Sequence, residues 1–235
     1  MSGLFVTFEG GEGSGKTTQL KLLANRIRAS GKEVNETRDP GGTGIGEGIR
    51  TLLLYSPLDA CVDRPGSAPI AAATELLLYE ASRAQLVREV IAPALARGTV
   101  VLCDRFTDST LAYQGVGRGI DCNLIQRLSR FSTDGLIPDL TILLDLDPRI
   151  GLARCRGGVD GDASTGLSTG LSAWDRIEAE PLDFHQRIRG GYLAMAREEP
   201  DRITVIDAGL SVTEIETIAW NQFLHLQDRC GHAVS

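Results

Sequence analysis

The chain has 235 residues, of which 42% are hydrophobic and 23% charged, a composition that suits a globular protein with a sizeable core and excludes a disordered chain. Its formal net charge of −7 argues against polymeric DNA or RNA as a partner, because proteins that wrap nucleic acid carry an excess of positive charge. The five cysteines are widely spaced without a CxxC pair, and no apolar run approaches the ~18–20 residues of a membrane span, so a zinc site, a disulfide framework and membrane insertion are not expected.

The predicted elements alternate between strand and helix. Strands are expected at residues 4–9, 33–38, 99–103, 140–144 and 202–206. Helices are expected at residues 16–28, 45–54, 70–95, 123–131, 181–197 and 212–226. Because the first strand begins at residue 4, no signal-like segment precedes it, and the cytoplasm is the expected compartment.

This alternation predicts an α/β fold. Strands that alternate with helices imply right-handed βαβ crossovers and a parallel sheet of about five strands, with helices on both faces. In such sheets ligands bind outside the carboxyl ends of the strands. Residues 157–173 (GGVDGDASTGLSTGLSA) are rich in Gly, Ser, Thr and Asp and indicate a surface loop rather than a linker, so a single domain over 1–235 is expected.

A phosphate-binding loop is predicted between the first strand and the first helix. Residues 10–17 (GGEGSGKT) match G-x-x-x-x-G-K-[ST], in which glycines let backbone N–H groups and the helix N-terminus face phosphate oxygens. Lys16 is expected to bridge the β- and γ-phosphates, and the Thr17 hydroxyl to ligate Mg²⁺. The expected ATP-binding residues are Gly10, Gly11, Glu12, Gly13, Ser14, Gly15, Lys16, Thr17 and Thr18.

Such a loop alone is compatible with a GTPase, an ATPase or a small-molecule kinase. A GTPase would need an N-K-x-D base-reading motif, and none of the chain's lysines (Lys16, Lys21 and Lys32) follows an asparagine. A transporter-type ATPase would carry an LSGGQ-like signature, which is absent. A kinase with a small acceptor is therefore favoured.

Five ordered blocks then identify a resemblance. They are FEGGEGSGKTTQ (8–19), TRDPGGT (37–43), ELLLYEASRAQLV (75–87), DRFTDSTLAYQG (104–115) and DRIEAEPLDFHQRIRGGYL (175–193). From about residue 4 to residue 208 the chain resembles the bacterial thymidylate kinases, which are P-loop nucleoside-monophosphate kinases. The resemblance implies that ATP, with Mg²⁺, phosphorylates dTMP to dTDP in dTTP biosynthesis, and that the protein is a homodimer. It also implies an acceptor-binding region at about 38–95 and a mobile lid at about 148–180, with a flexible insertion at about 159–172.

The acceptor site is expected to combine an acid with arginines. By resemblance, Glu12 contacts the 3′-hydroxyl of the acceptor nucleotide, while Arg38 and Arg50 hold its phosphate, which a guanidinium fork matches in a bidentate way. The sequence departs from most relatives at Asp39, where they carry Glu. The resemblance also predicts that the Asp39–Pro40 peptide bond is cis.

The helix predicted at 70–95 supplies residues for the base. Tyr79 and Arg83 are four residues apart and share a face with Leu76, Leu86 and Val90. An arginine on such an apolar stripe must find acceptors, because an unpaired buried guanidinium is costly. The resemblance implies that Tyr79 stacks on thymine and that Arg83 bonds its O4.

Charged residues directly follow the strand predicted at 99–103. Asp104 can bind Mg²⁺ or its waters, and Arg105 can bridge the donor and acceptor phosphates as charge shifts during transfer. The resemblance implies that Thr110 meets the base edge and that Tyr113 crowds the sugar 2′ position. Gln114 completes the expected substrate-binding set.

The lid is expected to add positive charge. Arg154 and Arg156 match catalytic lid arginines of the resembling family, and Arg176, beyond the insertion, is a competing candidate. Two alternatives stay open: a kinase for another nucleoside monophosphate, and a nucleotide-dependent regulatory switch.

Overall fold

The structure, a computed structural model, describes residues 3–54, 70–157 and 176–231. Its centre is a five-stranded parallel sheet with the strand order β2-β3-β1-β4-β5. The strands are β1 Phe5–Glu9, β2 Val34–Arg38, β3 Val100–Asp104, β4 Leu140–Asp145 and β5 Ile203–Asp207. The predicted α/β fold is confirmed, and each strand boundary lies within one residue of its prediction.

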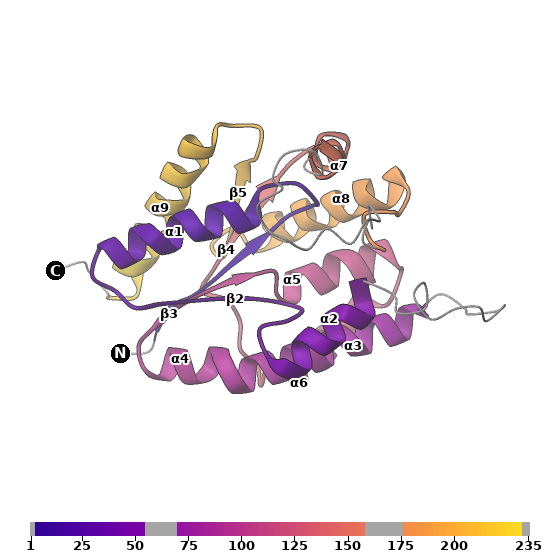
Figure 1. The fold of residues 1–235 in the computed structure, drawn as a ribbon, viewed down its shortest axis with the longest axis horizontal. Coiled ribbons are helices and arrows are strands. Elements are labelled where there is room, and N and C mark those ends of the chain that lie inside the picture. The colour runs from indigo at the N-terminus through magenta and orange to yellow at the C-terminus, as the bar shows by residue number, and fades with distance from the viewer. Residues whose placement is uncertain (1–2, 55–69, 158–175, 232–235) are drawn as a thin grey trace, which may run out of the picture.

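Helices cover both faces of the sheet (Figure 1). Helices α1 (Lys16–Ala29) and α9 (Val212–Arg229) pack on one face. The other face is covered by the continuous run α3 (Ala72–Leu86), η1 (Val87–Ile91) and α4 (Ala92–Ala96), with α2 (Gly44–Leu54) and α6 (Cys122–Ser132) packed on α3. Helix α8 (Leu182–Glu198) packs against β5 and the wide helical turn η2 (Leu111–Gly117).

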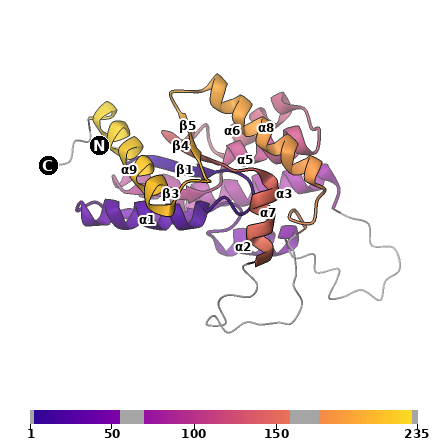
Figure 2. The same ribbon diagram turned by 90° about the horizontal axis from the view of Figure 1, so that it is seen from above.

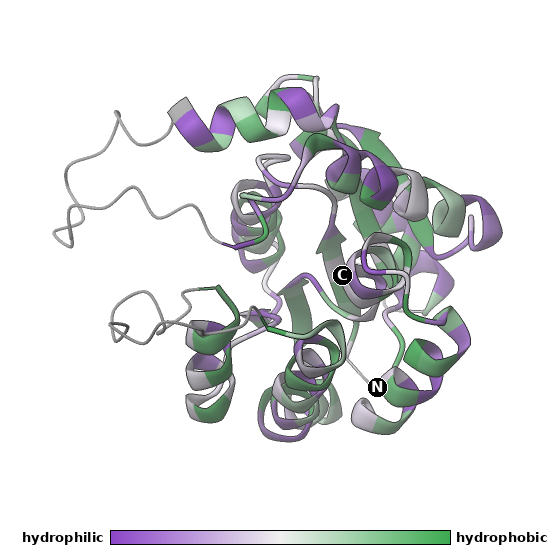
Figure 3. Cartoon of the chain, turned by 90° about the vertical axis from the view of Figure 1, so that its right-hand side faces the viewer, coloured by the Kyte–Doolittle hydropathy of each residue, from purple (hydrophilic) through white to green (hydrophobic). Residues whose placement is uncertain are grey.

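The core follows the two-residue period of the strands. In β1, Val6 and Phe8 face the α1 and α9 side, whereas Phe5 faces the α3 and η1 side with Leu86 and Ile91. The inner strands β1, β3 and β4 are covered on both faces and are hydrophobic almost throughout, whereas the edge strand β2 (VNETR) has no buried residue. Figure 3 shows the strands mostly green between helices that carry more purple residues.

Three helical predictions need correction. The single helix predicted at 70–95 widens at η1, where the Ala92 N–H donates to the Val87 carbonyl five residues back, just before Pro93, which has no N–H to continue a regular turn. The helical segments α5 (Thr107–Thr110) with η2, and α7 (Pro148–Gly157), were not predicted. Small and polar residues dominate the first, and three arginines and two glycines interrupt the second, so neither shows a clear apolar period.

Parts of two predicted regions lie outside the described residues. These are the insertion at 159–172 and residues 55–69 of the acceptor-binding region. Within the described ranges, no helix is both long and apolar enough to cross a membrane. In Figures 1 and 2, α2, α3 and α7 lie at the same end of the molecule, where the carboxyl ends of β1 and β3 also lie.

Candidate active site

The phosphate loop runs from the end of β1 into α1. Gly10, Gly13 and Gly15 have φ values of 137°, 64° and 89°, a region that side chains rarely adopt. A Cβ atom at Gly10 would also lie 2.4 Å from the carbonyl oxygen of Leu144. No side chain of the described residues caps α1 at Gly15, so its first N–H groups are available to a phosphate.

Lys16 folds back over this loop. Its Nζ donates to the Gly11 carbonyl at 2.8 Å and to Ser14 Oγ at 3.4 Å, and the residue is 8% exposed. Burial and the nearby Arg105 lower the pKa of Lys16. An anionic phosphate at the loop would relieve both effects.

Thr17 and Asp104 meet at the mouth of the loop. The Thr17 hydroxyl donates to Asp104 Oδ2 at 2.6 Å, although the two residues are 87 positions apart. A hydroxyl and a carboxylate are hard oxygen donors of the kind that Mg²⁺ takes. The two residues therefore fit the predicted metal site.

Arg105 connects β3 to the phosphate loop. Its φ is 70°, which is uncommon for a residue other than glycine, and this turn directs the side chain toward the loop. Nη1 donates to the Gly10 carbonyl at 3.0 Å and Nη2 to Glu12 Oε1 at 2.9 Å. Tyr113 also donates to Glu12 Oε1, at 2.6 Å. Burial alone would raise the pKa of Glu12, but Arg105 and Lys16 lower that pKa to about 2, so the carboxyl is ionised.

Two cavities adjoin at Arg105. The larger, about 790 Å³, surrounds the phosphate loop and includes Lys16, Thr17, Thr18, Arg38 and Asp104 among its lining residues. The smaller, about 110 Å³, is lined by residues that include Tyr79, Arg83, Thr110, Tyr113 and Gln114. Glu12, Asp39, Arg50 and Arg105 line both. Ligands in the two cavities would therefore meet at a wall that carries two arginines and two carboxylates.

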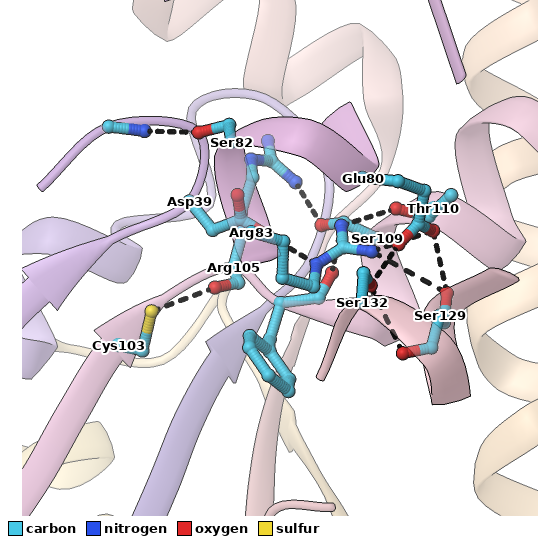
Figure 4. A network of polar contacts seen from close by, with 12 residues as sticks. Asp39, Glu80, Ser82, Arg83, Cys103, Arg105, Ser109, Thr110, Ser129 and Ser132 are labelled. Carbon is cyan, nitrogen blue, oxygen red and sulfur yellow. Dashed lines mark hydrogen bonds and ion pairs between the residues drawn. The ribbon is translucent and has the colours of Figure 1, made fainter. Parts of the chain in front are cut away.

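The smaller cavity is built on a buried ion-pair network around Arg83 (Figure 4). Arg83 is 1% exposed, and it donates to Asp39 at 2.6 Å, to Glu80 at 2.9 Å and to Thr110 at 2.5 Å. Burial opposes its charge, but Asp39 and Glu80 raise the pKa of Arg83 above its usual value. Glu80, which is itself bonded to Ser129, was not predicted from sequence.

Asp39 gains a partner that the sequence did not reveal. Its Oδ2 accepts from Arg83, while Oδ1 is buried without a hydrogen-bond partner among the described residues. Burial raises the pKa of Asp39, against the lowering effect of Arg83. The Asp39–Pro40 peptide bond is cis, as predicted.

The two arginines expected to hold the acceptor phosphate lie differently. Arg50 donates to the Pro40 carbonyl at 3.0 Å and lines both cavities. Arg38 pairs with Glu47 at 2.8 Å and lines only the larger cavity. The structure therefore brings Arg50, rather than Arg38, to the junction of the cavities.

The arginines predicted for the lid also make different contacts from one another. Arg154 reaches the carbonyls of Gly13 at 3.4 Å and Ala208 at 3.3 Å. Arg156 lies on the exposed last turn of the same helix. Arg176, the competing candidate, forms an ion pair with Glu75 at 2.5 Å. Glu75 also accepts from Gln114 at 2.7 Å, so Arg176 belongs to the acceptor side of the site.

A buried carboxylate behind the loop was missed. Glu9, the last residue of β1, accepts from the Phe106 N–H at 2.7 Å, from Ser109 at 2.6 Å and from Tyr192 at 2.7 Å. Burial and the charge of Asp108 raise the pKa of Glu9 to about 7. An acid at the end of an otherwise apolar strand (LFVTFE) is the signal that could have revealed it.

Comparison with known proteins places this geometry in a family. The family model described as thymidylate kinase matches residues 8–218, which include the phosphate loop, both cavity walls and α7. The chain belongs to the thymidylate kinase family. It is 49% identical to the thymidylate kinase of Solidesulfovibrio magneticus over 92% of this chain and 97% of the relative. It is 48% identical to that of Deinococcus radiodurans over 93% of this chain and 95% of the relative.

A solved thymidylate kinase has the same fold. The crystal structure of the Ehrlichia chaffeensis thymidylate kinase is 31% identical, and the match has a TM-score of 0.70 over 95% of this chain and 99% of the solved one. The sequence resemblance is thereby confirmed over nearly the whole length.

Proposed function

We propose that this thymidylate kinase transfers the γ-phosphoryl group of ATP to dTMP, giving ADP and dTDP. The proposal rests on the fact that two cavities share lining residues, Arg105 among them. The complete phosphate loop lines one cavity, and the second cavity lies next to it at Arg105. A donor and an acceptor phosphate bound in the two cavities would therefore both lie next to the Arg105 guanidinium. Positioning of this kind supplies much of the rate of phosphoryl transfer.

The reaction forms a bond from a dTMP phosphate oxygen to the γ-phosphorus and breaks the bond to the β,γ-bridging oxygen. Lys16 holds the β- and γ-phosphates over the loop, and Arg105 follows the negative charge between acceptor and donor. Thr17 and Asp104 would hold Mg²⁺, which when bound neutralises charge on the donor phosphates. Arg50 holds the acceptor phosphate, and Arg154 brings a further positive charge from α7.

The acceptor cavity supports a deoxypyrimidine nucleotide. Tyr79 offers a ring to the base, and the Arg83 network forms the polar end of the cavity with Thr110. Tyr113, held by its bond to Glu12, leaves its ring beside the sugar and disfavours a 2′-hydroxyl. Ionised Glu12 is an acceptor for the 3′-hydroxyl.

The test is a comparison of kcat/KM across nucleotides with ATP and Mg²⁺. We expect kcat/KM for dTMP to exceed the values for dCMP, dGMP and ribothymidylate, and we expect Lys16→Met to lower turnover with each by a factor on the order of 10²–10³. A higher value for another monophosphate would replace dTMP as the substrate. Absence of any product in a single turnover with dTMP would favour the regulatory-switch alternative.

The family resemblance implies an assembly and a compartment for this protein. We propose a homodimer in the cytoplasm. Sedimentation at micromolar concentration would give twice the 25.2 kDa chain mass for the dimer, and a value near the chain mass would refute it.

A further inference from the structure

Glu9 has no part in the transfer mechanism above, yet it lies directly behind the phosphate loop and is fully buried. We propose that Glu9 is a positioning residue for phosphoryl transfer, which holds Arg105 in its bridging place through the Phe106 main chain and through the hydroxyls of Ser109 and Tyr192. The inference rests on the proposed kinase function. It assigns no substrate contact to Glu9 itself.

The strand delivers the carboxylate to this place. Side chains alternate along β1, so Glu9 lies on the same side of the sheet as Phe5 and Thr7. This is the side opposite to α1, against which Val6 and Phe8 pack. Glu9 is in register with Leu143 of β4, and the neighbouring Phe8 is paired with Asp104 of β3. A central strand with partners on both sides moves little, so the carboxylate is a rigid reference point.

The first connection runs through the main chain. The Phe106 N–H belongs to the peptide that follows Arg105, whose φ of 70° is unfavourable for a residue with a side chain. The 2.7 Å bond from this N–H to Glu9 Oε1 stabilises that turn. Without it, the main chain at Arg105 would be free to return to the extended region and carry the guanidinium away from Gly10.

The second connection runs through two hydroxyls. Ser109 and Tyr192 both lie within hydrogen-bond distance of Glu9 Oε2, at 2.6 and 2.7 Å. Both also accept from Arg105 Nη1, at 3.3 and 3.4 Å. Each hydroxyl has a single proton, and a carboxylate is the strongest acceptor within reach, so bonding to Glu9 leaves the hydroxyl lone pairs for Arg105.

The two connections act on the same guanidinium from opposite ends. One sets the start of the Arg105 side chain, and the other sets Nη1 at its tip. The base, the sugar and the donor phosphates are held mainly by groups other than Arg105, so loss of Glu9 should lower kcat more than it raises either KM. Displacing a reacting group by about 1 Å can cost on the order of 10² in rate, which sets the expected scale.

The experiment is a double-mutant cycle between Glu9→Ala and Arg105→Ala, measured with dTMP and ATP. We expect Glu9→Ala to lower kcat by roughly 10- to 100-fold in the wild-type background and by less than about threefold when Arg105 is already absent. Equal losses in both backgrounds would overturn the inference. So would a raised KM with kcat retained.

Thr7→Val is the matched control. Thr7 is buried on the same face of β1, two residues before Glu9, and bonds to Thr141 rather than to the active site. We expect it to lower the melting temperature while leaving kcat unchanged in both backgrounds. A comparable loss of kcat in Thr7→Val would show that general weakening of β1 explains the Glu9 effect.

Two further variants keep the inference testable if Glu9→Ala does not fold. Glu9→Gln retains volume and one acceptor oxygen for the Phe106 N–H but places an N–H donor opposite the hydroxyls of Ser109 and Tyr192. It should therefore recover part of the turnover, and its remaining loss should disappear when Arg105 is absent. Tyr192→Phe keeps the ring but removes a hydroxyl that touches both Glu9 and Arg105, and should lose about three- to tenfold in kcat only when Arg105 is present. If the wild type prefers another monophosphate, the same cycle is run with that substrate, so failure of the dTMP proposal is distinguished from failure of the Glu9 inference.

Discussion

The phosphate loop and the acceptor cavity differ in what their positively charged side chains bond to. The loop is eight consecutive residues, and most of its binding groups are main-chain N–H groups. Its ammonium, on Lys16, bonds to a carbonyl and a hydroxyl. The acceptor cavity is assembled from distant elements, and the guanidinium of Arg83 is matched by the carboxylates of Asp39 and Glu80.

This difference separates charges that serve a ligand from charges that serve the fold. Burial and the nearby Arg105 lower the pKa of Lys16, and among the described residues no carboxylate hydrogen-bonds to its ammonium, so an incoming phosphate supplies the missing negative charge. Arg83 has a raised pKa because its partners are already in place. We therefore expect substitutions at the loop to affect turnover first, and substitutions in the acceptor network to affect stability and acceptor binding together.

The largest expected effect is that of Arg83→Ala on stability. Removing the guanidinium leaves two buried carboxylates without their partner, which typically costs about 3–5 kcal/mol. The KM for dTMP should rise and the choice among bases should relax, while the KM for ATP should stay nearly constant. Urea unfolding and steady-state kinetics measure both effects.

Asp39→Asn is the control for this prediction. Adding it to Arg83→Ala removes one of the stranded charges, so the double variant should be less destabilised than the sum of the single variants. An unchanged unfolding midpoint in Arg83→Ala would show that the network is not structural. An equal rise in the KM for dTMP and the KM for ATP would show that the network around Arg83 does not act on the acceptor site alone.

Lys16→Ala should produce the next largest effect, and this effect should be on turnover rather than on stability. Losing one charge donor at the transition state costs on the order of 10²–10³ in kcat. The melting temperature should be nearly unchanged, because truncation also removes the repulsion between Lys16 and Arg105. Lys32→Ala, just before β2 at the amino ends of the strands and away from the phosphate loop, should leave kcat at the wild-type value. A Lys16→Ala protein that keeps near-normal turnover would refute the assigned role.

Tyr113→Phe tests the wall that the two cavities share. The ring stays, but Glu12 loses a hydrogen bond from the phenol, and a bond to a charged acceptor contributes about 1.5 kcal/mol. We expect kcat/KM for dTMP to fall about tenfold, with the ratio of dTMP to ribothymidylate nearly retained because the ring still crowds the 2′ position. Loss of this ratio would show that the hydroxyl, not the ring, selects the sugar.

The smallest expected effect concerns pH and contrasts the two acids of the loop region. The pKa of Glu9 is raised to about 7, so between about pH 4.5 and pH 7 the folded state binds more protons than the unfolded state, and its contribution to stability falls as pH rises. Glu12, with a pKa of about 2, is ionised in both states above pH 5 and adds no slope there. The difference in melting temperature between wild type and Glu9→Gln should therefore shift by a few degrees between pH 5 and pH 8, to the disadvantage of the wild type. This shift corresponds to a change in unfolding free energy on the order of 1 kcal/mol or more. A constant difference would contradict the raised pKa.

The amino-acid sequence by itself determined the five strands and the phosphate loop. Both depend on neighbours along the chain: apolar runs specify β1, β3, β4 and β5, and the glycines of residues 10–15 specify a path that residues with a Cβ rarely follow. The resemblance to thymidylate kinases also followed from ordered local blocks. These features are local, so they could be predicted without knowing what packs against them.

Only the tertiary structure decided which charged groups meet. Arg83 and Asp39 are 44 positions apart, and Glu9 and Tyr192 are 183 positions apart, so no local pattern pairs them. The helical stripe on α3 looked apolar with one arginine, yet it also buries Glu75 and Glu80. Glu80 pairs with Arg83 and accepts from Ser129 of α6. Glu75 pairs with Arg118 and Arg176 and accepts from Gln114 of η2. A charge can be buried only where a distant partner offsets its desolvation, and that partner exists only once the sheet has brought the elements together.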